Sequence, residues 1–313
     1  MISWTIPAIF SFLFFAFGTT IERFYMGRKV LRPELSVFFV GLLSLFYIIF
    51  IPFVDFYVID PYLFLKTLLV SSFQVGGLFL LYYSLTKFDA SSFVPAITAF
   101  MPIFSFGAGI FLSNSSVSIA GIVAFLFLLS GSFIVSYHKK IEITKETLFS
   151  AFLTSILLSM FFVFSKFVFE ESNFWTGFIW INIADFVISS LIIVFYKEAR
   201  DNLLEIIRKA REAKAKREYY KIKYPLAYGF SKISGGIGTI LQLFAVSIVP
   251  SQYIGIIQAF QGLEIFFVIL FSLLFFKIWK DFPTDIAQDK NLVKRVSGAV
   301  LISIGLVIVH LYL

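Results

Sequence analysis

Three polar side chains recur at every third position inside an otherwise apolar stretch, IIQAFQGLEIFF. They are Gln258, Gln261 and Glu264. Steps of three residues in a helix rotate by about 300° each, so these side chains form a stripe roughly 120° wide. The stripe borders the face of Gly255 and Gly262, where missing side chains weaken the helix. Two amides and a carboxylate on one face can bind a polar solute or hydrogen-bond to neighbouring helices.

Further polar groups lie deep inside apolar segments. A charge at the centre of a bilayer costs at least about 2.5–3.5 kcal/mol, so it must face protein or water. Asp185, one turn after Asn182, and Glu264 have side chains too short to reach the headgroups from mid-depth. Lys232 lies in GFSKISGGIGTI, whose small residues allow another helix to approach closely. Lys232 therefore either faces a central cavity or extends to the membrane surface.

Two more polar side chains complete this set. Gln74 is the main polar group in the predicted core of the first half of the chain. Lys166 is followed four residues later by Glu170, so we expect these two side chains to pair at the outer interface.

Two interpretations of the buried polar groups remain open. In one they form the wall of a substrate cavity, and either Asp185 or Glu264 could exchange a proton and couple transport to it. In the other they form interhelical hydrogen bonds that hold the bundle together.

The sequence offers little for metal or redox chemistry. It has no cysteine, and His138 and His310 lie far apart without ligand spacing. We expect no metal, no cofactor and no enzymatic activity.

The composition requires a lipid environment. The 313 residues are 59% hydrophobic, 20% aromatic and only 14% charged. Soluble domains average about 45–50% apolar and about 25% charged residues. The sequence therefore predicts an all-α integral membrane protein.

Apolar segments separated by polar clusters predict ten transmembrane helices. A span needs about 20 apolar residues. The first segment has no cleavage site, so we expect it to be retained. The predicted spans are 3–22, 35–54, 61–86, 90–112, 117–137, 147–169, 174–196, 224–248, 251–276 and 292–312.

The positive charges predict the orientation. All but three of the 26 Lys and Arg residues lie in the odd-numbered connections; the exceptions are Lys66, Lys166 and Lys232. Positive connections stay in the cytoplasm, so both termini are predicted to lie outside, in the plasma membrane. The net charge of +7 then reflects topology and lipid contact rather than nucleic-acid binding.

The basic segment 197–223 is the longest polar connection. Leucines and isoleucines give it one apolar side. It is either a helix lying on anionic lipid headgroups or a solvated linker helix.

An internal repeat divides the chain into residues 1–145 and 146–313, with five spans each. A shift of 160 residues places ITAF on IQAF, Pro95 on Gly255 and Pro102 on Gly262. These four positions are the predicted helix breaks. An odd number of spans per repeat makes the repeats inverted. Inverted repeats with interrupted helices are typical of secondary transporters.

The chain resembles the drug/metabolite transporter superfamily, EamA-like family. The resemblance is carried by YYSLTKFDASSFVPAITAFMPIFSF (82–106), GIVAFLFLLSGSFIV (121–135), SGAVLISIGLVIV (297–309) and FAFGTT (15–20). It implies ten spans in two inverted repeats and transport of a small metabolite.

The sequence thus favours a secondary transporter for a small organic solute such as an amino acid, metabolite or amphipathic amine, either proton-coupled or an exchanger. The alternatives are a membrane scaffold or lipid-handling protein, and an enzyme acting on lipid-linked substrates.

Overall fold

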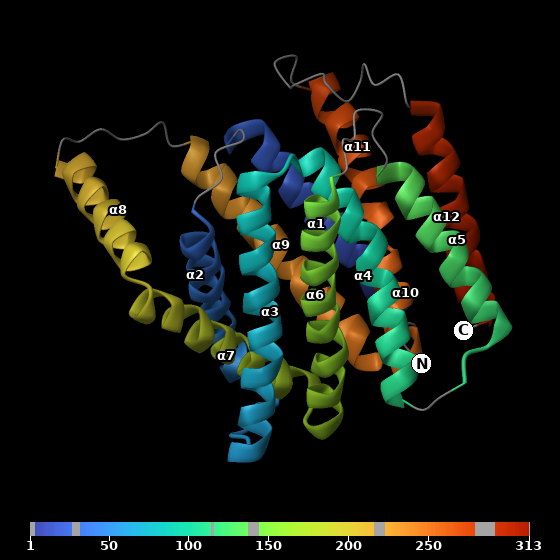
Figure 1. The fold of residues 1–313 in the computed structure, drawn as a ribbon, viewed down its shortest axis with the longest axis horizontal. Coiled ribbons are helices and arrows are strands. Elements are labelled where there is room, and N and C mark those ends of the chain that lie inside the picture. Colours follow the sequence, from blue (N-terminus) through green and yellow to red (C-terminus); the bar gives the residue numbers. More distant parts are fainter. Residues whose placement is uncertain are drawn as a thin grey trace.

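The computed structural model describes residues 4–26, 32–113, 116–136, 144–215, 223–278 and 292–312. This part of the chain is helical and has no strand (Figure 1). The elements are α1 (Thr5–Met26), α2 (Pro33–Ser44), the 3-10 helix η1 (Leu45–Phe53), α3 (Pro61–Lys87), α4 (Ala90–Ser113), α5 (Ile119–Ser136), α6 (Lys145–Glu171), α7 (Phe174–Phe195), α8 (Lys197–Ala215), α9 (Lys223–Ile248), η2 (Ser251–Tyr253), α10 (Ile254–Ala259), α11 (Gln261–Ile278) and α12 (Leu292–Tyr312).

Within the described residues, seven helices are long and apolar enough to cross a membrane. Three shorter apolar helices cover Thr5–Ile21, Ile119–Val135 and Ser297–Tyr312. The protein is therefore an all-α, multi-pass membrane protein. The helices coincide with the ten predicted segments to within a few residues, although ten crossings remain a prediction. Much of the positive charge used to predict orientation lies in 27–31, 137–143, 216–222 and 279–291, outside the described residues.

Local sequence explains where several helices begin. Asp60 precedes α3, and its carboxylate accepts hydrogen bonds from the backbone N–H groups of Tyr62 and Leu63 at 2.9 and 3.0 Å. Pro61 occupies the first helical position, where no backbone N–H is needed. Asn173 caps α7 in the same way, accepting from the N–H of Thr176 at 2.7 Å.

Small residues bring pairs of helices into close contact. A side chain added at Gly18 of α1 would meet the Ser231 carbonyl of α9 at 3.0 Å, and Ser234 of α9 donates to the Phe14 carbonyl at 2.6 Å. At the α5–α12 crossing, a carbon added at Gly131 would lie 2.7 Å from the Gly298 carbonyl. Figure 1 shows α5 and α12 side by side along this contact.

The predicted helix breaks differ between the two halves. In the second half the helix is interrupted: α10 ends at Ala259 and α11 begins at Gln261. In the first half, α4 continues through both Pro95 and Pro102. The expected interruption at these prolines was therefore wrong. A proline removes one backbone donor, and neighbouring helices can stabilise the bent region. α6 also holds α4 next to Pro102, since Ser159 donates to the Met101 carbonyl at 2.8 Å.

The basic segment forms α8, which contacts α7 and α2 and stands at the edge of the bundle in Figure 1. Glu198 of α8 pairs with Arg32, which precedes α2, at 2.7 Å. Ala199 is fully buried, whereas Leu204 is 58% exposed. The helix therefore has one attached end and an exposed apolar side chain.

Candidate functional site

A single hydroxyl group bridges the interruption of the ninth segment. Ser132 of α5 donates to the carbonyl of Ala259 at 2.6 Å and accepts from the N–H of Gly262 at 3.1 Å. The backbone turn itself is tightened by a bond from the Leu263 N–H to the Phe260 carbonyl at 2.7 Å. Ser132 thus supplies the partner that two backbone groups lose where the helix breaks.

Glycine is required on both sides of this interruption. A carbon added at Gly262 would lie 2.4 Å from the hydroxyl oxygen of Ser132. A carbon added at Gly255 would lie 2.4–2.6 Å from Phe106 of α4. Both glycines were predicted as break positions. The interruption falls at Phe260, which is fully buried and stacks on Trp4 at 6.1 Å between ring centroids.

The two glutamines on either side of Phe260 each have a buried polar atom that finds no partner among the residues that the structure describes. Gln258 is 1% exposed, and its amide nitrogen Nε2 donates no hydrogen bond. The amide oxygen Oε1 of Gln261 is buried and accepts none. A buried polar atom left without a hydrogen bond costs about 1–3 kcal/mol, so such atoms call for an explanation. The Gln258 N–H donor and the Gln261 oxygen acceptor are therefore available to a bound ligand at the helix interruption.

Glu264 lies one turn farther along α11 and is half-buried. Its carboxylate accepts a hydrogen bond from the Thr19 hydroxyl of α1 at 3.2 Å. Thr19 belongs to the FAFGTT segment of the first helix. The acid is thus turned toward α1 rather than toward the surrounding acyl chains.

A second cluster surrounds Asp185 of α7, which is only 3% exposed. One terminal atom of the Gln74 amide, from α3, lies 2.9 Å from the Asp185 oxygen Oδ2 and 3.2 Å from Oδ1. The Ser71 hydroxyl, one turn earlier on α3, faces the same carboxyl and donates to the Ile181 carbonyl at 3.0 Å. The structure therefore brings together Gln74 and Asp185, two residues that the sequence analysis had placed in separate halves.

Tyr47 links this cluster to α9. Its hydroxyl lies close enough to Asp185 to interact electrostatically with it, and donates to the Gly236 carbonyl at 3.3 Å. Its ring contacts Phe178 of α7 at 4.8 Å between centroids. A carbon added at Gly236 would lie only 3.3 Å from the Tyr47 hydroxyl oxygen. Glycine at this position therefore leaves room for the hydroxyl.

The remaining predicted residues have different surroundings. Asn182 is buried, but its amide nitrogen donates within α7, to the Phe178 carbonyl at 2.8 Å. Lys232 is half-buried on α9, and its predicted cavity role remains a prediction.

Lys166 is paired with Glu170 at 3.5 Å, which confirms the predicted ion pair. Its side chain is only 8% exposed and donates to the Ser247 carbonyl, in the last turn of α9, at 2.7 Å. This lysine therefore also joins α6 to α9.

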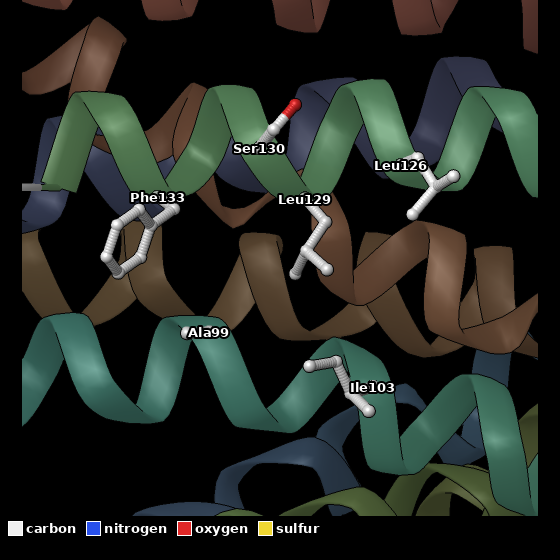
Figure 2. Close-up of a pocket in the computed structure, with 6 residues that line it drawn as sticks. All are labelled: Ala99, Ile103, Leu126, Leu129, Ser130 and Phe133. Atoms are coloured by element: carbon white, nitrogen blue, oxygen red, sulfur yellow. The ribbon is translucent and has the colours of Figure 1, made fainter.

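Two apolar grooves lie elsewhere. One, of about 280 Å³, separates α4 from α5; Figure 2 shows Leu126, Leu129 and Phe133 facing Ala99 and Ile103, with the Ser130 hydroxyl pointing away. The other, of about 340 Å³, is lined by Phe100, Leu148, Phe149 and Phe152 of α4 and α6. Neither groove contains a predicted site residue. Among the described residues, no group of three or more metal-binding side chains occurs.

Ser132, Tyr47, Thr19 and Ser71 were not singled out from the sequence. An isolated hydroxyl in an apolar helix usually bonds to its own backbone, so its type alone does not mark it as part of a site. Ser132 and Thr19 lie in two of the family-like segments, and this was the available signal for them.

Comparison with known proteins gives the fold but no activity. No family model matches the chain, and no curated protein matches it. A solved structure described only as "Crystal structure of protein" covers 96% of this chain and 97% of its own, at 12% identity and a TM-score of 0.62. At this identity, the likeness shows that nearly the whole chain shares its fold with that protein and nothing further.

Proposed function

We propose that the protein is a secondary transporter that moves a small organic solute across the plasma membrane by alternating access. The observation that carries this proposal is the helix interruption at Phe260, flanked by the unpartnered amide atoms of Gln258 and Gln261. Secondary transporters build substrate sites at interrupted helices, where backbone and polar side chains become available to a ligand.

The helix contacts support two inverted five-helix repeats. Under the proposed pairing of the first five segments with the last five, α1 corresponds to α6, and α3 to α9. α1 contacts α9 and α11, whereas α6 contacts α3 and α4, as the pairing requires. The proposed equivalents α2 and α7 contact one another, as do α5 and α12 and α4 and α10. This exchange of contacts agrees with a two-fold relation between the repeats.

The proposed topology has ten spans, odd-numbered connections in the cytoplasm and both termini outside. In this orientation α8 lies on the cytoplasmic side. Its exposed Leu204 and its many basic residues suit contact with anionic lipid headgroups.

The side chains around the interruption suit a polar solute with both donor and acceptor groups. Gln258 offers an N–H, Gln261 offers a carbonyl oxygen, and Glu264 offers a negative charge one turn away. Amino acids carry all three complementary groups, whereas amphipathic amines carry the donor and the positive charge. A strongly anionic solute would face the Glu264 charge and is disfavoured.

The experiment is a thermal-shift screen of the purified protein against small metabolites, followed by uptake into proteoliposomes. We expect Gln258→Leu to abolish the ligand-induced shift while leaving the ligand-free melting temperature unchanged or raised. The physical reason is that leucine removes a buried donor that has no partner in the protein. If the amides served instead to hold helices together, Gln258→Leu would lower the ligand-free melting temperature.

Lipid handling is the second candidate, favoured by the two apolar grooves, which have the size and chemistry for acyl chains. A protein that produces no shift with any soluble metabolite but speeds the flip of labelled lipid in liposomes would support this role over solute transport.

A further inference from the structure

The contact between Asp185 and Gln74 can form in two ways, because both side chains can change between donating and accepting a hydrogen bond. An amide side chain presents either its N–H₂ or its oxygen after a half-turn about its last bond. An ionised carboxylate only accepts hydrogen bonds, whereas a protonated carboxyl also donates one. At 2.9 and 3.2 Å, the terminal amide atom is within hydrogen-bond distance of both carboxyl oxygens.

Two of the four possible combinations match the hydrogen-bonding groups of the pair best. Ionised Asp185 requires the Gln74 nitrogen, which can donate to both carboxyl oxygens. Protonated Asp185 can instead donate its O–H to the Gln74 oxygen. The Gln74 oxygen beside ionised Asp185 brings two acceptors together inside the protein, where an unmade hydrogen bond is costly. The Gln74 nitrogen beside protonated Asp185 keeps a hydrogen bond to only one of the two carboxyl oxygens, so it loses one of the bonds that the ionised form accepts. Proton uptake and the half-turn of the amide are therefore linked.

We propose that Asp185 and Gln74 form a proton-binding site, in which the Gln74 amide reverses its orientation when Asp185 takes up a proton. The neighbouring elements are suited to this role. Ser71 on α3 faces the carboxyl with a hydroxyl whose proton bonds to the Ile181 carbonyl, and Tyr47 on η1 is a titratable side chain that interacts with Asp185. On α2 the facing residue is the uncharged Gly41, next to the Asp185 backbone carbonyl.

The site also has a route to the substrate region. Tyr47 connects it to Gly236 of α9, and α9 contacts α1 at Gly18. The next residue of α1, Thr19, donates to Glu264 beside the helix interruption. The proton site and the solute site are thus joined by one chain of contacts. The use of this site for coupling rests on the proposed transport function, whereas the proton binding itself does not.

Infrared difference spectroscopy between acidic and alkaline buffer tests the site without any solute. We expect a carboxylic acid C=O band, appearing at low pH, that shifts when aspartate is ¹³C-labelled and not when glutamate is. An amide C=O band sensitive to ¹³C-glutamine should change in the same spectrum. The chain has seven other aspartates, so the variants described next are needed to assign the aspartyl band to Asp185.

Matched variants then assign the bands. Asp185→Asn should remove the aspartyl band, and Gln74→Leu should move it to higher frequency by removing its acceptor. Glu264→Gln is the control and should leave both bands in place. Aspartyl bands that are the same in Asp185→Asn and in the wild-type protein, or an Asp185 band unaffected by Gln74→Leu, would overturn the proposal.

Transport assays separate this inference from the proposed function. With a solute identified by the thermal-shift screen, Asp185→Asn should retain exchange of labelled for unlabelled solute but lose accumulation driven by a proton gradient. Accumulation that persists in this variant, or that follows a sodium gradient instead, would reject the coupling role. If the wild-type protein transported no solute, the proposed transport function would be rejected. The infrared spectra would still show whether Asp185 and Gln74 bind a proton.

Discussion

At the scale of single residues, Ser132 shows how much one hydroxyl can stabilise. The interruption at Phe260 leaves the Ala259 carbonyl and the Gly262 N–H without their usual helical partners, in a fully buried region. Ser132 satisfies both, at 2.6 and 3.1 Å. An interrupted helix inside a membrane protein is stable only when such groups find partners in neighbouring helices.

We therefore expect Ser132→Ala to destabilise the protein by about 1–3 kcal/mol, because two buried backbone groups lose their hydrogen bonds. The measurement is the melting temperature in detergent. Ser130→Ala is the matched control, since Ser130 is exposed and bonds only to Phe127 of its own helix at 3.1 Å. Equal melting temperatures for the two variants would contradict the bridging role.

Lys166 shows a related effect at the end of a helix. The last carbonyl groups of a helix lack intrahelical donors and carry a partial negative charge, which a cation stabilises. Lys166 reaches the Ser247 carbonyl in the last turn of α9 while pairing with Glu170 of its own helix. Lys166 thus supplies both a hydrogen-bond donor and a positive charge at the end of α9.

Lys166→Met should lower the free energy of unfolding by about 1.5–3 kcal/mol, the range for a lost hydrogen bond to a charged group. The comparison is Lys66→Met. Lys66 pairs with Glu171 at 2.6 Å, but both side chains are substantially exposed. Exposed ion pairs contribute little because water and salt screen them. A larger loss for Lys66→Met, in the same unfolding assay, would refute this account.

At the scale of elements, glycine decides how closely helices approach. The interruption is surrounded by such contacts: Gly255 lies against α4, and Gly262 lies against Ser132 of α5 and Ile302 of α12. Without a strong hydrophobic force between helices in lipid, close packing and interhelical hydrogen bonds hold a membrane bundle together.

Gly262→Ala is expected to destabilise the protein by roughly 1–3 kcal/mol, because the added carbon collides with Ser132 and forces the helices apart. Gly107→Ala is the control on α4, where an added carbon meets nothing within 4 Å. There, alanine's better helix propensity should leave stability unchanged or raise it by up to about 1 kcal/mol. The measurement is the melting temperature of each variant relative to the wild-type protein. A Gly262→Ala variant as stable as Gly107→Ala would contradict the prediction.

At the scale of the whole molecule, contacts recur in pairs related by exchange of the two proposed repeats. In secondary transporters, inverted repeats allow two arrangements that differ mainly in which side of the membrane opens, and we propose the same for this protein. The interruption breaks the symmetry, since the ninth segment is divided and α4 is continuous. The proposed solute site therefore belongs mostly to the second repeat.

The orientation can be measured with introduced cysteines, because the natural chain has none. Val58, 80% exposed between η1 and α3, should react as Val58→Cys with an impermeant maleimide added to intact cells. Asp201→Cys, on the exposed side of α8, should react only after the cells are permeabilised. The wild-type chain provides the unlabelled control. The opposite pattern would place the termini in the cytoplasm.

The sequence by itself determined the helical class, the helix positions and the burial of Asn182, Asp185 and Gln258. These follow from local properties, because a segment's apolar length and its charges decide whether it enters lipid. The Lys166–Glu170 pair was likewise readable, since its members lie one helical turn apart.

Only the tertiary structure decided which polar groups meet. Gln74 and Asp185 are separated by most of a repeat, and Ser132 lies more than a hundred residues before the backbone that it bridges. Such contacts depend on how each helix is rotated and how closely it approaches its neighbour, and residue spacing along one helix carries no information about either. For the same reason, the sequence marked weak points at Pro95, Pro102, Gly255 and Gly262, whereas packing placed the interruption at Phe260.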